Sequence, residues 1–159
     1  ADIVTHSTTK YMDGHGMTVG GVIVDSGNFD WMAHAEKFPG LCTPDESYHG
    51  IVYAEKFGKE GAFITKATAQ LMRDFGSTPS PQSAFILNLG LESLHVRVPR
   101  HCENGLAVAK YLKAHEQIEW VTYPGLEGDK YYETAKKYMP NGTCGVVSFG
   151  VKGGRAAAE

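Results

Sequence analysis

The sequence predicts a mixed α/β fold in two parts, residues 1–79 and residues 80–159. Three observations support this prediction. Two β-branched runs frame a glycine-containing loop near the start of the chain. Apolar residues then recur at helical spacing through the middle of the sequence. A strand, a helix and another strand follow, which favours an α+β lobe with an antiparallel sheet.

The first two strands are expected on either side of a polar loop. Residues 3–5, Ile-Val-Thr, are typical of a buried strand. Residues 18–24 are nearly continuous in small and branched side chains, as in a strand that is covered on both faces. Between these runs the chain presents residues 7–10, Ser-Thr-Thr-Lys, and then residues 14–16, Gly-His-Gly. Small hydroxyl residues beside a single lysine suit a binding site better than a core.

The residue types of this loop predict a specific chemistry. In an extended segment, Ser7 and Thr9 point to one side and Lys10 points to the other. The hydroxyls would donate hydrogen bonds to a phosphate, while the amine condenses with a carbonyl. A phosphorylated aldehyde fits that division. The alternative is a solvated turn, which is the more common setting of a lone lysine after a Ser/Thr cluster.

Composition narrows the possible partners. The net charge of −3 provides no electrostatic footprint for nucleic acid or for an anionic membrane. No apolar run approaches the length that a bilayer span needs. The three cysteines are far apart in sequence and lack the paired spacing of a zinc site, so we expect reduced thiols in a cytoplasmic protein and no metal.

The middle of the sequence predicts a long loop followed by a helix. Residues 37–58 are rich in Pro and Gly, and a loop of this length is usually functional or mobile. Residues 61–75 carry apolar side chains on one helical stripe. Gly76 follows where a left-handed C-cap is expected.

A second helix is predicted to begin at Ser80, which can cap it, with Pro81 at the first helical position. Pro99 should kink or end this helix, and a further helix is expected over residues 100–115. An apolar stripe, which would face the core or another helix, recurs at spacings of three and four residues in Ala84, Leu87, Leu91, Leu94 and Val98.

Shorter elements are expected in the last third of the chain. Residues 118–123 alternate like a half-buried strand and end at a Pro-Gly turn. A helix is predicted over residues 129–138 and a strand over residues 145–149. The final residues resemble the first turns of another helix, so we expect the chain to be an internal piece of a longer polypeptide.

The loop around Lys10 resembles the lysine motif of the Cys/Met-metabolism enzymes that depend on pyridoxal 5'-phosphate (PLP). The residues that carry the resemblance are Asp2-Ile3, Ser7 to Met12, Gly14-His15-Gly16 and the following run Val19 to Asp25. The likeness covers essentially the whole chain. It implies the fold of a PLP-dependent transferase of fold type I, in which Lys10 binds the cofactor covalently and moves protons, while Ser7 and Thr9 hold its phosphate.

The resemblance also implies a domain assignment. Residues 1–79 correspond to the C-terminal part of the PLP-binding large domain, and residues 80–159 to a connector helix and the first part of the small C-terminal domain. The family forms homotetramers, so association is expected. Pro99 departs from the family, whose connector helix usually lacks a proline there.

Residues 37–58 are similar to the insertion that marks the O-acetylhomoserine sulfhydrylase branch of the family. This similarity implies γ-replacement on O-acetyl-L-homoserine with sulfide or a thiol, which gives homocysteine or methionine. Tyr48 and His49 would line the substrate entrance, although ordinary loop packing is the alternative for both residues.

Other functions remain open on sequence alone. A cystathionine γ-synthase or γ-lyase, or a methionine γ-lyase, shares the lysine motif. A fragment with only a structural or interaction role is the alternative from another class. His6 and His15 lack the partners of a catalytic triad, and the glycines after Lys10 do not form a dinucleotide-binding fingerprint because no helix follows them.

Overall fold

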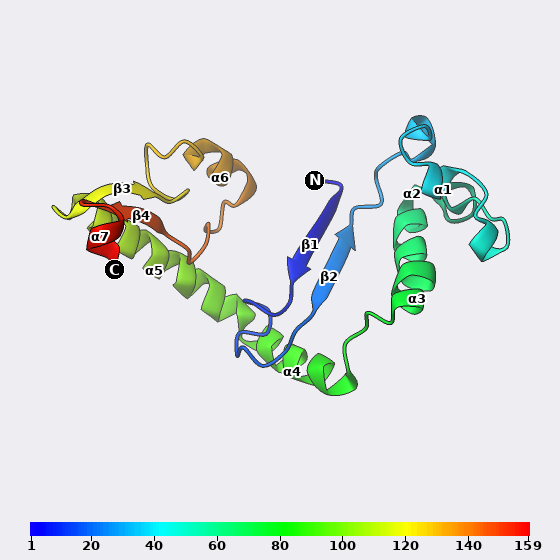
Figure 1. Cartoon of the computed structure of the whole chain (residues 1–159), viewed down its shortest axis with the longest axis horizontal. Coiled ribbons are helices and arrows are strands. Elements are labelled where there is room, and N and C mark those ends of the chain that lie inside the picture. Colours follow the sequence, from blue (N-terminus) through cyan, green and yellow to red (C-terminus); the bar gives the residue numbers. More distant parts are fainter. The chain divides into compact units, whose positions relative to one another are not determined.

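The computed structural model describes all residues from 1 to 159. They form two compact units, Ala1–Gly90 and Leu91–Glu159. Figure 1 shows the elements of each unit along the chain. No helix combines the length and the apolar character that crossing a membrane requires.

The first unit begins with an antiparallel ribbon of two strands. β1 spans Ile3–Ser7 and β2 spans Gly21–Asp25, with Ile3 opposite Asp25 and Ser7 opposite Gly21. Both strands were predicted, but the prediction that the second is covered on both faces is wrong. Val22, Ile23 and Val24 are 36%, 45% and 53% exposed. The composition of β2 is that of a buried strand, but α2, which contacts it, leaves these side chains partly exposed.

The predicted loop over residues 37–58 is more ordered than expected. It contains the short helix α1, Pro39–Cys42, and the 3₁₀ turn η2, Glu46–Tyr48, after an earlier 3₁₀ turn η1 at Met32–His34. Asp45 and Ile51 then form an isolated antiparallel bridge. Short elements of this kind lack the length over which a hydrophobic period is recognisable.

The helix predicted from Gly61 begins earlier, because α2 spans Tyr53–Lys66. Gly58, with φ of +64°, kinks α2 and separates its first turns from the periodic stripe. A π-helical segment, η3, continues over Ala67–Met72, and α3 spans Arg73–Phe75. Gly76 caps the end in the left-handed region at φ of +69°, as predicted.

Aromatic side chains form the core of the first unit. Trp31 is 6% exposed, lies parallel to Phe63 at 5.9 Å between ring centroids, and meets Phe38 edge-on at 5.2 Å. Tyr53 is fully buried. Such stacked and edge-to-face pairs add stability beyond the area that they bury. This cluster joins α1 and α2 into one layer, to which Leu41, Ala54 and Ala62 also belong.

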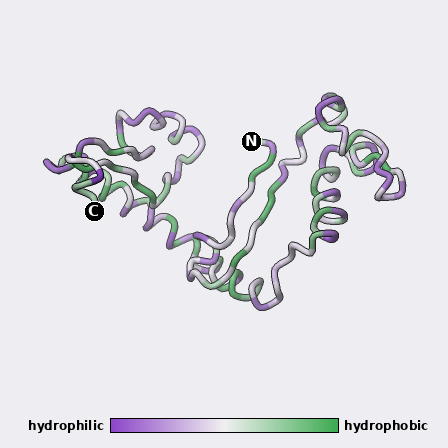
Figure 2. The backbone as a smooth tube through the Cα atoms, in the orientation of Figure 1, coloured by the Kyte–Doolittle hydropathy of each residue, from purple (hydrophilic) through white to green (hydrophobic).

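The next helix, α4, spans Pro81–Glu92 and begins as predicted. Ser80 caps it, because its Oγ accepts a hydrogen bond from the Ser83 N–H at 3.1 Å. Figure 2 shows hydrophobic residues along both β2 and α4. The helix break follows at Ser93 rather than at Pro99.

The second unit is built on the long helix α5, Leu94–Ala114, which runs through Pro99. The prediction that Pro99 begins a new helix is therefore wrong. Pro99 removes only one backbone donor, near the start of α5. The N–H groups of Val96 and Arg97 donate to the Ser93 carbonyl before it. The long part of the helix after Pro99 keeps its backbone hydrogen bonds.

The predicted antiparallel sheet of the second unit is confirmed. β3, Ile118–Thr122, pairs with β4, Ser148–Val151, with a register shift between Ile118 and Trp120. The helix α6, Tyr132–Tyr138, lies between them in sequence, and α7, Arg155–Ala158, follows. Tyr123 is 1% exposed at the centre of this unit, and its hydroxyl lies 3.2 Å from the Cys102 carbonyl and 2.8 Å from the Cys144 carbonyl.

Candidate functional site

Lys10 lies in a tight turn directly after β1. Its N–H approaches the Ser7 carbonyl at 3.4 Å, and its carbonyl accepts a hydrogen bond from the Gly14 N–H at 2.9 Å. The expectation of an extended segment through Lys10 is therefore wrong, because β1 ends at Ser7 and the chain turns there. The side chain of Lys10 is exposed. The ion pairs of the chain leave Lys10 out, so its amine is not committed to a carboxylate.

Thr9 joins this turn to the start of β2. Its Oγ1 accepts a hydrogen bond from the Gly20 N–H at 3.1 Å and lies 3.5 Å from the Gly20 carbonyl. The Thr8 N–H also donates to that carbonyl at 3.0 Å. Because 3.5 Å is the limit of a hydrogen bond, the hydroxyl hydrogen of Thr9 can turn to a stronger acceptor. Ser7 is exposed beside it.

Asp13 organises the far side of the turn, and the sequence analysis missed it. Its side chain is fully buried, and Oδ2 accepts hydrogen bonds from the N–H groups of Met17 at 2.8 Å and Thr18 at 3.1 Å. Burial alone would raise the pKa of Asp13, but these two N–H groups and His15 hold that pKa below its ordinary value. Asp13 is therefore an anion that backbone dipoles stabilise. Its position just before Gly14 was the available signal, since Asp readily bonds to nearby backbone in turns.

Gly90 brings α4 against the same loop. A Cβ atom on Gly90 would clash with the carbonyl oxygen of Asp13 and would lie 2.5 Å from that of Met12. Only glycine permits this close approach. The sequence signal was a single glycine inside the apolar stripe of α4, which often marks a packing contact.

Tyr48 and His49 lie elsewhere in the first unit. The Tyr48 ring stacks on the buried Tyr53 at 5.7 Å between centroids and lies below the Arg73 guanidinium at 5.9 Å. His49 has a left-handed backbone with φ of +61°. The structure thus places Ser7 at the end of β1 and Thr9 and Lys10 in the turn that follows it, whereas Tyr48 and His49 lie on a different loop.

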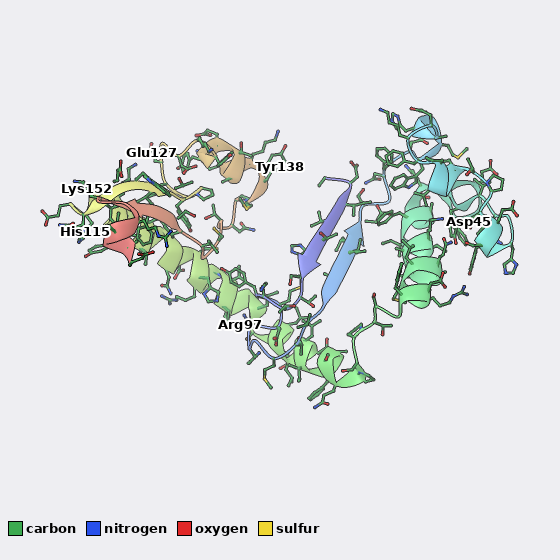
Figure 3. The ribbon with its side chains drawn as sticks, viewed as in Figure 1. Asp45, Arg97, His115, Glu127, Tyr138 and Lys152 are labelled. Carbon is green, nitrogen blue, oxygen red and sulfur yellow. The ribbon has the colours of Figure 1, made fainter.

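Asp45, which is labelled in Figure 3, anchors that second loop to α2 through a hydrogen bond from Lys66. Its carboxylate accepts hydrogen bonds from Lys66 Nζ at 2.6 Å and from the backbone and hydroxyl of Ser47. The Lys66 and Ser47 bonds lower the pKa of Asp45 to about 2. Lys66 also lies over the Tyr53 ring, with Nζ 4.8 Å from its centroid.

Comparisons with known proteins assign the whole chain to one family. The profile of the Cys/Met metabolism PLP-dependent enzyme family matches residues 1–159. The chain belongs to this family. Because the family depends on PLP, the lysine motif found in the sequence has its expected setting, and the predicted α/β transferase fold is confirmed.

Several relatives support a finer comparison. The chain is 51% identical over 152 residues to a homocysteine/cysteine synthase from Kluyveromyces lactis, covering 96% of this chain and 34% of the relative. It is 48% identical over 167 residues to an O-acetyl-L-homoserine sulfhydrylase from Leptospira meyeri, covering 100% and 37%. The chain thus spans about a third of the length of the curated relatives it matches.

A solved structure shows the same fold. A crystal structure described as an O-acetylhomoserine (thiol)-lyase from Campylobacter jejuni superposes with a TM-score of 0.81 at 32% identity. The match covers 96% of this chain and 37% of that chain. That protein carries a pyridoxyl-lysine monophosphate, which is a lysine joined to the cofactor.

The residues of the lysine loop fit PLP. An exposed amine without a carboxylate partner stands beside two hydroxyls, and hydroxyl and backbone N–H donors are the groups that hold a phosphate. Gly14 and Gly16 both have positive φ, at +72° and +67°, so the backbone turns there without a side chain that would obstruct a ligand.

Proposed function

We propose that the protein catalyses γ-replacement on O-acetyl-L-homoserine with sulfide or a thiol, giving homocysteine or methionine. The observation that carries the proposal is the uncommitted Lys10 amine on the loop between β1 and β2, in a chain similar to enzymes named homocysteine synthase and O-acetyl-L-homoserine sulfhydrylase. The whole activity belongs to the longer protein, because the relatives are about three times the length of this chain.

The role proposed for Lys10 is to hold the cofactor and then to move protons. When bound, PLP supplies an electron sink for a carbanion at the α-carbon of an amino acid. Lys10 Nζ holds it covalently until the substrate amine takes its place. The released Nζ then accepts a proton from the substrate α-carbon and returns protons to neighbouring carbons.

Ser7 and Thr9 are proposed to hold the cofactor phosphate. Each hydroxyl donates one hydrogen bond to a phosphate oxygen, and a bond to a charged acceptor is about twice as strong as a neutral one. Thr9 would keep its bond from the Gly20 N–H while its hydrogen turns to the phosphate. Thr9 would therefore contribute both to phosphate binding and to the local fold, whereas Ser7 would contribute to phosphate binding alone.

The domain assignment follows the same proposal. Residues 1–79 would belong to the large cofactor domain, and residues 80–159 would supply the connector helix and the first part of the small domain. In support, the boundary between the two compact units falls inside α4, so the connecting element is helical.

The remaining proposals concern the surroundings of the site. Tyr48 and His49 would line the substrate entrance, the protein would act in the cytoplasm, and its assembly would be a homotetramer. The exposed apolar residues of β2 fit contact with another surface, either of the longer protein or of a second copy.

A visible absorption scan of the full-length protein with added PLP tests the cofactor assignment. Lys10→Ala should abolish the protein-dependent visible band, whereas Lys37→Ala should leave it unchanged, because Lys37 lies outside the loop. Borohydride treatment followed by peptide mass spectrometry should place the cofactor on Lys10. A band that survives in Lys10→Ala would refute the assignment.

A product assay tests the reaction. The wild-type protein with O-acetyl-L-homoserine and sulfide should release acetate and homocysteine in equal amounts. A keto acid and ammonia formed without sulfide would favour γ-elimination, as in a γ-lyase. The same assay on the 159-residue chain alone shows whether the fragment has activity without the rest of the protein. If neither the fragment nor the whole protein binds PLP or forms product, a structural role is favoured.

A further inference from the structure

We propose that Asp13 is a positioning residue for Lys10, and that its buried carboxylate sets the conformation of the loop that carries the amine. The inference deepens the proposed function and rests on Lys10 being the cofactor lysine. Four observations on the loop carry it: the bonds of the carboxylate, the bonds of the Asp13 backbone, the packing of α4, and the absence of an ion pair between Asp13 and a lysine or arginine.

The carboxylate of Asp13 ties together the two ends of the loop segment that follows Lys10. Oδ2 receives the N–H groups of Met17 and Thr18, at 2.8 Å and 3.1 Å. Both donors precede β2, so one oxygen atom connects the turn after β1 to the approach to the next strand. Bonds from backbone N–H groups to a carboxylate are among the strong hydrogen bonds of proteins.

The backbone of Asp13 closes the segment that contains Lys10. The Asp13 N–H donates to the Thr8 carbonyl at 2.9 Å, which encloses Lys10 in a ring of hydrogen-bonded backbone. The Asp13 carbonyl lies 2.6 Å from His15 Nδ1. The conformation of residues 8–13 therefore depends on where Asp13 is held.

Helix α4 fixes Asp13 from outside the loop. Gly90 lets the helix backbone approach the carbonyl oxygens of Met12 and Asp13 directly. A shift of Asp13 toward α4 is blocked by backbone atoms, which cannot rotate away as a flexible side chain can. The loop is therefore held from inside by hydrogen bonds and from outside by packing.

The charge of Asp13 is satisfied without a lysine or an arginine. Oδ1 is buried and makes no hydrogen bond, and its nearest ionisable neighbour is His15 Nδ1 at 3.7 Å. Backbone donors thus hold the carboxylate in place, and the Lys10 amine is left out of any ion pair that would compete with covalent chemistry. Asp13 therefore positions the loop, and the Lys10 amine remains available for reaction.

Amide hydrogen exchange in the cofactor-free, full-length protein tests the positioning role without reference to activity. Asp13→Ala should speed exchange at the Met17 and Thr18 amides by about tenfold or more, since both lose a charged acceptor. Asp13→Asn should be intermediate, because one amide oxygen can still accept a bond.

Cofactor uptake provides the second readout. The rate of growth of the Lys10-dependent visible band, and the apparent affinity for PLP, should fall about tenfold in Asp13→Ala and less in Asp13→Asn, because a misplaced amine reacts slowly. The matched control is Asp25→Ala. Asp25 also accepts a backbone N–H through Oδ1, from Gly27 at 3.0 Å, and also has a buried Oδ2 without a hydrogen bond, but it lies at the far end of β2. That variant should take up PLP like the wild type.

The outcomes separate this inference from the proposed function. Asp13 variants that fold and take up PLP with wild-type rate and affinity would overturn the positioning role and leave Lys10 in place as the cofactor lysine. If Asp13→Ala does not fold, Asp13→Asn decides, and wild-type behaviour of that variant overturns the inference. A band that persists in Lys10→Ala would instead refute the proposed function.

Discussion

Two loops of the first unit are each organised by one aspartate, and they use its charge in different ways. In the lysine loop, residues 8–18, Asp13 is fully buried and accepts two backbone N–H groups. In the loop of residues 43–52, Asp45 is 12% exposed in its side chain and binds the Lys66 ammonium. The same residue type therefore anchors one loop mainly through backbone N–H groups and the other mainly through a salt bridge to α2.

The difference has a chemical reason. A carboxylate that binds a lysine lowers its own pKa and keeps that amine protonated. This suits a structural anchor such as Lys66, but a protonated amine cannot condense with a carbonyl. The backbone N–H groups that bind Asp13 hold the lysine loop in place, and Lys10 takes part in no salt bridge.

Gly90→Ala should affect the lysine loop most. The new methyl group would meet the backbone carbonyls of Met12 and Asp13, so we expect the free energy of unfolding to fall by about 1–3 kcal/mol, as for overpacked cores. Uptake of PLP should weaken in parallel, because Asp13 must move. Urea denaturation and the visible band measure the two effects.

Gly61→Ala is the matched control in α2. Its new methyl would lie 3.4 Å from Phe57 Cβ, which is ordinary contact, and alanine raises helix propensity by about 1 kcal/mol relative to glycine. Stability should therefore be unchanged or slightly raised. Equal losses in Gly90→Ala and Gly61→Ala would show that the contact with the lysine loop is not what requires glycine.

Asp45→Asn should loosen the loop of residues 43–52 without disturbing the lysine loop. The melting temperature should fall by a few degrees, because the charged bond to Lys66 is lost. Lys66→Met should have a similar effect, and the double variant should lose little more than either single one, since both remove the same interaction. Additive losses in differential scanning calorimetry would contradict the pair, and PLP uptake should be unchanged throughout.

Acid should remove the contribution of Asp45. Its pKa is lowered to about 2 by Lys66 and Ser47, below the value of about 3.9 for an unfolded chain. The native state therefore gains stability above pH of about 4, and this gain is lost as the pH falls toward about 2. The melting-temperature difference between wild type and Asp45→Asn, measured from pH 7 to pH 2, should be constant at first and then vanish. A constant difference over the whole range would contradict the assignment.

His49→Gly should have the smallest effect on stability. Glycine adopts the positive φ of +61° without strain, so the free energy of unfolding should change by less than about 1 kcal/mol. If His49 lines the entrance, KM for the amino-acid substrate should rise while the PLP band is unchanged. Unaltered steady-state kinetics would leave His49 with a turn-forming role only.

Local signals were sufficient where one short segment determines the structure. The strands β1 and β2, the cap at Ser80 and the left-handed Gly76 all follow from a few neighbouring residues. The family resemblance likewise rested on a contiguous motif around Lys10 and was confirmed over the whole chain. The positions of Ser7, Thr9 and Lys10 on one loop follow from the same motif, and their roles stay predictions.

Signals that depend on distant residues were not recognised. The helix start at Tyr53 was missed because Gly58 interrupts the periodic stripe, and the break at Ser93 was placed at Pro99 because proline is the stronger local signal. Asp13 looked like one more turn residue, since only the folded loop brings Met17 and Thr18 onto its carboxylate.

Residue type and spacing within one short motif were enough to identify the family and its dependence on PLP, and they make Lys10 the predicted cofactor lysine. The tertiary structure alone decided how that lysine is presented. The burial of Asp13, the close approach of Gly90 and the pairing of Asp45 with Lys66 each join residues that are separated along the chain. Such contacts form only when folding brings distant residues together, so a local sequence pattern does not predict them.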